Sequence, residues 1–192
     1  MKKTLLASVA AAALALTTLS ATAQMNGQPG DMKDPTAGGA AMYPSKTIVE
    51  NAVNSPIHTT LVAAVKAAGL VDTLNSPGPF TVFAPTNDAF AKLPAGTVDT
   101  LVKPENKATL TKILTYHVVP GRLSARDIEA GIKAGGGKYE MTTVEGGKLT
   151  ATMSGKKIML TDEKGGMATI TTANVYQSNG VIDVIDTVLM PS

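Results

Sequence analysis

The sequence predicts an α+β domain, because helical patterns fill its first half and short strand patterns fill its second. From Tyr43 to Ala130 apolar residues recur at helical spacing, whereas from Tyr139 onward runs rich in β-branched residues alternate with Gly-containing turns. The turns are spaced by roughly 8–14 residues, which is typical of antiparallel strands. We therefore expect several helices that cover a sheet.

The N-terminus predicts an exported protein. A basic start and an apolar stretch from Leu5 to Leu19 precede Ala21-Thr22-Ala23, the small-x-small pattern that signal peptidase reads. We interpret residues 1–23 as a secretory signal peptide, residues 24–42 as a flexible linker rich in Gly, Pro and Asp, and residues 43–191 as one domain. No segment is expected to span a membrane, since a span needs about 20 mostly apolar residues.

Three helices are predicted with defined ends. Leu61, Val65 and Ala68 form an apolar stripe that stops at Gly69, a residue suited to a left-handed helix terminus. The segment from Pro104 to Leu114 begins with a proline that fits the first turn of a helix. A third helix starts at Ser124, since Ser124-Ala-Arg-Asp127 resembles a capping box with Asp in place of Glu.

The stretch TVFAPTNDAF, Thr81 to Phe90, predicts an interior strand followed by a short helix. Apolar residues lie on both faces of the run before Pro85, and a proline cannot donate to a strand ladder. Thr86 is placed to cap a helix that ends at Phe90, and Asn87 or Asp88 can satisfy nearby backbone groups. We interpret Thr86, Asn87 and Asp88 as a structural joint.

The final run, VIDVIDTVLM, fits a helix or a strand by its period, but its β-branched residues and the preceding Asn179-Gly180 turn favour a strand. On that strand Asp186 shares a face with apolar residues, whereas Asp183 points the other way. Because an acid on an apolar face needs a partner, we predict that Asp186 accepts hydrogen bonds from backbone amides, a hydroxyl or a basic side chain.

Composition excludes several function classes. Without Lys2 and Lys3 the 17 basic residues fall to as many as the 15 acidic ones, so a nucleic-acid partner is not expected. The chain contains no Cys and only two His, and it lacks the sequence patterns of hydrolase triads and zinc proteases. We therefore predict that the protein is not an enzyme and uses no metal or cofactor.

Three separated motifs now point to a family. TVFAPTNDAF, then ILTYHVVPGRLSA at Ile113–Ala125, then SNGVIDVIDTVLMP at Ser178–Pro191, occur in an order and spacing that closely resemble a fasciclin-like domain. The resemblance extends from about Tyr43 to Pro191. It implies a β-wedge of two antiparallel-rich sheets, with about seven strands in all, flanked by several helices. It also implies a secreted or surface-attached adhesion module of the small bacterial single-domain type, without a catalytic centre.

The resemblance also names candidate binding residues. Tyr116-His117 matches a Tyr-His element that is linked to integrin binding in some relatives, and Asn174-Val175 stands where those relatives carry an Asp-Ile pair. From the residues alone we favour a structural role for His117, on a short strand after the Pro104–Leu114 helix. We predict that His117 forms a hydrogen bond with the Thr86-Asn87-Asp88 turn.

Two functions remain open at this point. The first is an exported, non-enzymatic cell-adhesion or matrix module, expected to be a monomer, that binds a protein or polysaccharide of the cell surface or matrix. The second is a periplasmic or cell-surface protein that binds a small apolar ligand in a groove between the sheet and the helices, which an exposed patch of Met141, Met153 and Met159 would support. A concave apolar pocket favours the second, and a filled wedge favours the first.

Overall fold

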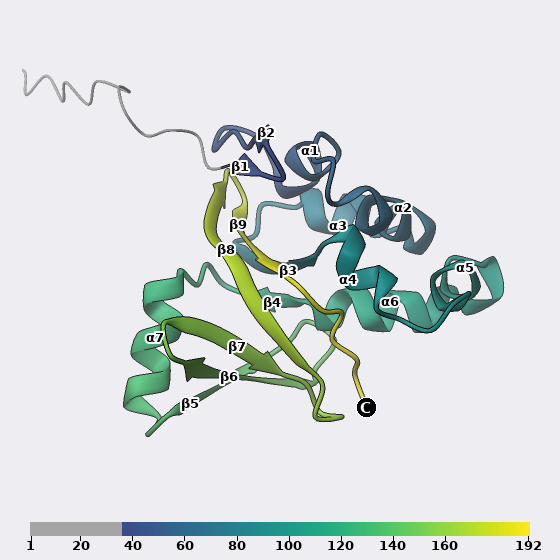
Figure 1. Cartoon of the computed structure of the whole chain (residues 1–192). Coiled ribbons are helices and arrows are strands. Elements are labelled where there is room, and N and C mark those ends of the chain that lie inside the picture. The colour runs from purple at the N-terminus through teal and green to yellow at the C-terminus, as the bar shows by residue number, and fades with distance from the viewer. Residues whose placement is uncertain (1–35) are drawn as a thin grey trace, which may run out of the picture. The chain divides into compact units, whose positions relative to one another are not determined.

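The structure, a computed structural model, describes residues 36–192 (Figure 1). The predicted signal peptide lies outside these residues. The helices are α1 (Ile48–Ala52), α2 (Thr59–Ala68), α3 (Val71–Asn75), α4 (Asn87–Ala91), α5 (Thr97–Leu101), the 3-10 turn η1 (Pro104–Asn106), α6 (Lys107–Tyr116) and α7 (Ala125–Ala134). The strands are β1 (Thr36–Ala37), β2 (Ala40–Ala41), β3 (Phe80–Pro85), β4 (Val118–Pro120), β5 (Lys138–Thr142), β6 (Lys148–Ser154), β7 (Lys157–Thr161), β8 (Met167–Gln177) and β9 (Gly180–Ile185).

The helix ends predicted at Gly69 and Ser124 are found at these residues. Helix α2 buries Leu61, Val65 and Ala68 and ends at Gly69, whose φ of 71° is left-handed. Helix α7 begins at the capping box of Ser124 and Asp127, in which each side chain accepts from the other residue's backbone amide. The predicted Pro104–Leu114 helix begins as η1 and continues as α6 to Tyr116.

Seven strands form one mixed sheet in the order β4-β3-β9-β8-β7-β6-β5. Only β3 and β9 are parallel, and every other neighbouring pair is antiparallel. The long strand β8 pairs with β7 through Met167–Thr169 and with β9 through Ile170–Gln177. The two expected sheets are therefore two parts of one continuous sheet, and β8 belongs to both parts. The predicted α+β wedge is confirmed. The ladder nearly closes, since the Val144 amide after β5 donates to the Val118 carbonyl of β4 at 2.7 Å.

Two hydrophobic clusters lie on opposite faces of the central strands. In the first, which we call the helix-side cluster, Val82 and Ala84 of β3 pack with helices α1 to α6. In the second, the α7-side cluster, Phe83 packs with α7 and strands β5 to β8. Figure 1 shows the same division, with α7 alone beside the β5–β7 half and the other helices grouped around β3 and β9. The prediction that both faces of this strand are interior is confirmed.

The hairpin β1–β2 corrects the predicted linker. Residues 36–42 belong to the fold, because Ala37 and Met42 are only 2% and 1% exposed and join the helix-side cluster. Gly38 and Gly39 make the turn with φ of 63° and 83°, a conformation that glycine adopts without strain. Burial of apolar side chains thus outweighs the Gly-rich composition that predicts a linker.

Candidate functional site

The Thr86-Asn87-Asp88 turn joins two helices. The Thr86 hydroxyl accepts from the Ala89 amide at 3.2 Å and caps α4, as predicted. Asn87 reaches across to α2, where its Oδ1 accepts from the Thr60 amide at 3.0 Å and its Nδ2 donates to the Pro56 carbonyl. Asp88 is exposed on the first turn of α4. The polar atoms of this turn thus position helices.

His117 lies at the C-terminal end of α6 and not beside that turn, so the predicted hydrogen bond is wrong. Its Nδ1 is 2.8 Å from the Ile113 carbonyl oxygen, and its Nε2 accepts from the Leu189 amide at 3.0 Å. The first contact requires a proton on Nδ1 and the second forbids one on Nε2, so the ring is neutral. Burial lowers the pKa of His117 to about 4.

The position of His117 at the C-terminal end of α6 explains its hydrogen bonds. The last carbonyls of a helix lack intrahelical donors, and the His117 amide itself donates to Leu114. The imidazole therefore satisfies the Ile113 carbonyl and at the same time holds the C-terminal segment through Leu189. The predicted strand at Tyr116-His117 is wrong for the same reason, since β4 begins only at Val118.

Tyr116, the last residue of α6, is fully buried, and its ring lies edge-on to that of His117 with 6.5 Å between the ring centroids. Its hydroxyl donates to the Lys148 carbonyl at 2.6 Å and accepts from the Glu163 amide at 3.2 Å. Burial raises the pKa of Tyr116 to about 12, so the phenol stays protonated. Both polar groups of the Tyr-His element are thus bonded to backbone.

Asn174 and Val175 lie in an irregular part of β8. Asn174 has a φ of 62°, which makes it the one non-glycine residue of the described chain with positive φ. Its Oδ1 accepts from the Ala125 amide at 2.8 Å, which holds the start of α7. Val175 is fully buried. Of the four candidate binding residues, only Asn174 has some exposure, and Tyr116 and His117 belong to a different element.

Asp183 is a buried acid that the sequence interpretation placed on the other face without assigning it a role. It is 0% exposed, its Oδ1 accepts from the Asn174 amide at 2.9 Å, and its Oδ2 has no partner among the described residues. Burial raises the pKa of Asp183 to about 6. The sequence feature that could have predicted this burial is VIDVI, in which apolar residues occupy both faces of the strand. Such a pattern is typical of a central strand with no side facing solvent, as β9 is.

Asp186 follows β9, which ends at Ile185, so it does not share a strand face with Ile182 as expected. Its Oδ1 nevertheless accepts from the Thr169 amide at 2.8 Å and from the Thr187 hydroxyl at 3.0 Å, as predicted. Burial alone raises the pKa of Asp186, but these bonds and Lys92 outweigh it and hold the pKa below its usual value.

Asp186→Asn is expected to lower the melting temperature, because it removes the charge that these donors stabilise. The side chain is partly exposed, so the loss is about 1 kcal/mol or less, equivalent to roughly 2–4 °C. Differential scanning calorimetry measures it. Glu129→Gln is the matched control, at an acid with no hydrogen bond or ion pair among the described residues, and equal melting temperatures for the two variants would contradict the assignment.

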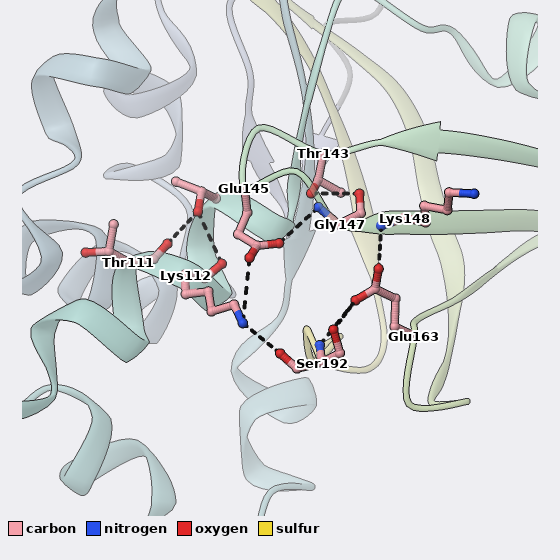
Figure 2. A network of polar contacts seen from close by, with 9 residues as sticks. Thr111, Lys112, Thr143, Glu145, Gly147, Lys148, Glu163 and Ser192 are labelled. Atoms are coloured by element: carbon pink, nitrogen blue, oxygen red, sulfur yellow. Dashed lines mark hydrogen bonds and ion pairs between the residues drawn. The ribbon is translucent and has the colours of Figure 1, made fainter.

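A polar network holds the last residues (Figure 2). Lys112 donates to the Ser192 carbonyl at 2.7 Å and lies 3.7 Å from the Glu145 carboxylate. Glu163 accepts from the Ser192 hydroxyl at 2.6 Å and from the Lys148 amide at 2.9 Å. Figure 2 shows that Ser192 lies between Lys112 of α6 and Glu163 of the β7–β8 turn. Glu145 of the β5–β6 turn lies beside Lys112. Lys112 and Glu163 thus hold the C-terminal residue against the domain.

The small-ligand alternative requires an apolar pocket between the sheet and the helices, with Met141, Met153 and Met159 as its expected markers. Met141 is buried, and none of the three lines the apolar cavity that lies between α2 and the β3–β9 strands. That cavity has a volume of about 40 Å³. Pockets for drug-sized ligands measure about 300–1,000 Å³. The helix-side core is a filled wedge.

His58 lies on the wall of this cavity. Its Nδ1 is 2.8 Å from the Ser55 hydroxyl, and its Nε2 has no hydrogen-bond partner among the described residues. Burial lowers the pKa of His58, which the nearby Ala84 carbonyl partly offsets. A Ser-His pair alone does not make a catalytic triad: among the described residues Ser55 is the only side chain hydrogen-bonded to the ring, and His58 is 2% exposed.

The part of the chain from residue 36 onward contains no group of three His, Cys, Asp or Glu side chains close enough to hold a metal ion. None of its helices combines the length and apolar character that a bilayer span requires.

Comparisons with known proteins agree with this architecture. The Fasciclin domain model matches residues 56–191. Protein sll1483 of Synechocystis is 49% identical over 83% of this chain and 81% of its own length. Immunogenic protein MPB70 of Mycobacterium bovis is 41% identical over 73% of this chain and 66% of its own length. Cell surface glycolipoprotein MPB83 of the same species is 37% identical over 83% of this chain and 67% of its own length.

A solved structure shares the fold. The FAS1 domain pair from the insect cell adhesion molecule Fasciclin I superimposes with a TM-score of 0.68 and 18% identity, over 77% of this chain and 51% of the insect chain. With the wedge, the motifs and the matched residues in agreement, this chain belongs to the fasciclin domain family.

Proposed function

We propose that the protein is an exported adhesion or matrix-interaction module that binds a protein or polysaccharide of the cell surface or matrix. The observation that carries the proposal is its likeness to MPB83, a cell surface glycolipoprotein, over 83% of this chain. The insect protein with the same fold is a cell adhesion molecule. Residues 1–23, interpreted as a signal peptide, support export.

The chemistry of the core supports a binding role without catalysis. The fasciclin family is non-catalytic. The polar side-chain atoms of Tyr116 and His117 are buried and bonded to backbone groups, so they are not available to a substrate. Recognition by such a domain must therefore use its surface.

The surface favours a protein over a polysaccharide. The chain has four Tyr, three Phe and no Trp. Among the described residues the exposed aromatic rings are Tyr43 and Tyr176, which are 45% and 40% exposed. Sugar sites commonly use exposed rings for stacking, and a fasciclin domain usually binds proteins.

Deletion of the protein tests the proposal. Cells that lack it are expected to attach less to a surface coated with their own matrix, and expression of the wild-type chain restores attachment. An antibody against residues 36–192 should find the protein outside the cytoplasm. Attachment at the wild-type level after deletion contradicts the adhesion role, whichever surface of the domain is involved.

A further inference from the structure

An open groove of about 360 Å³ lies between α7 and the strands β7 and β8. Its walls are the first turns of α7, with Ala125 and Glu129, and the approach to β7, with Lys156 before the strand and Lys157 as its first residue. This volume falls in the range of about 300–1,000 Å³ that ligand sites occupy, unlike the helix-side cavity. In Figure 1 the groove region is the side of the wedge where α7 stands beside β7.

The floor of the groove is an apolar part of the sheet. Ile158 and Ile170, which are 5% and 8% exposed, belong to the α7-side cluster, and the small side chains of Ala125 and Ala173 pack against that cluster. The pairing of β7 with β8 stops at Met159–Thr169, after which β8 pairs with β9. The two strands therefore separate at the groove, so extended backbone borders the opening.

The rim is rigid and charged. Asn174 holds the first amide of α7 at 2.8 Å, and the Ser124–Asp127 capping box fixes the first turn. The two ion pairs found among the described residues use Lys112 and Lys148, so Lys156 and Lys157 have no acidic partner there. Glu129 on the facing wall adds one negative charge.

We propose that this groove binds an extended peptide of a protein partner, with an apolar side chain on the floor and an acidic side chain beside Lys156 and Lys157. The strand borders suit an extended backbone, and no aromatic ring lines the groove for stacking on a sugar. Glu129 repels a second acid at the α7 end, which sets the direction of the peptide. The inference rests on the proposed function, because it names the surface that holds the partner.

Two fluorescent pentapeptides, Thr-Ile-Thr-Val-Asp and Thr-Ile-Thr-Val-Lys, probe the groove by fluorescence polarisation with the full chain. We expect the acidic peptide to bind at least about 10-fold more tightly, and the difference to shrink at high salt. K156E/K157E should reverse the preference, and A173W should weaken both peptides by filling the groove. The matched control K103E/K107E changes the two lysines that flank η1 and should leave binding unchanged.

The outcomes separate the alternatives. Equal binding of the two peptides, no binding of either at 1 mM, or binding of a heparin fragment instead overturns the inference. K156E/K157E is a surface change, so it stays informative where A173W fails to fold. If deletion lowers cell attachment while K156E/K157E cells attach normally and the peptide does not bind, the groove inference fails and the adhesion role stands.

Discussion

His117→Ala is expected to lower the free energy of unfolding by about 3–5 kcal/mol, the largest single effect that we predict. The side chain is only 2% exposed, and its ring joins the Ile113 carbonyl to the Leu189 amide. Its removal leaves a cavity and two buried backbone groups without partners. Native domains have only about 5–15 kcal/mol of stability, so urea unfolding should show the loss clearly.

His117→Phe separates packing from hydrogen bonding. Phenylalanine retains most of the ring volume but cannot bond to either backbone group, so about 2–3 kcal/mol of the loss should remain. Hydrogen exchange at the Leu189 amide should quicken in this variant. The control is His58→Phe, which removes another buried imidazole, one bonded to Ser55 and close to the Ala84 carbonyl but without a bond to the C-terminal segment. If His117→Phe costs no more than His58→Phe, the two hydrogen bonds of His117 do not hold the C-terminal segment.

The sequence predicts the local elements of this domain well because their signals are local. Gly69, Ser124 and Thr86 each act within four residues of their own position, as a helix end or a cap, and the structure uses each as predicted. The α+β class follows from the same kind of information. The β1–β2 hairpin is the exception, since only contacts with distant residues make a Gly-rich segment part of the core.

The partners of polar side chains are harder to predict, because they are set by elements distant in the chain. His117 and Leu189 are 72 residues apart, and Asn87 bonds to Thr60 across 27 residues. A sequence indicates that a buried imidazole needs partners, but the topology decides which ones. Asp183 shows the same limit, since its burial depends on β9 lying between β3 and β8.

The pH dependence of stability should reveal two buried groups with opposite proton preferences. The pKa of Asp183 is about 6 in the folded state against 3.8 for an ordinary Asp. Between these values the folded protein binds more protons than the unfolded chain, so Asp183 makes stability fall as pH rises from about 4 to 6. The pKa of His117 is about 4 in the folded state against 6.5 for an ordinary His. Here the unfolded chain binds more protons, so His117 makes stability rise with pH over the same window.

The two contributions should therefore cancel in the wild type and appear in the single variants. A difference of one bound proton between the folded and unfolded states changes the free energy of unfolding by about 1.4 kcal/mol per pH unit, or by about 3 kcal/mol from pH 4 to 6. Relative to the double variant, His117→Phe should lose about that much over the window because Asp183 acts alone, and Asp183→Asn should gain it. His58 and the exposed acids are common to all four proteins, so their effects cancel in the comparison. Urea unfolding at half-unit steps of pH measures the slopes, and parallel profiles for the two single variants would show that the buried acid and the buried imidazole do not titrate with shifted pKa values.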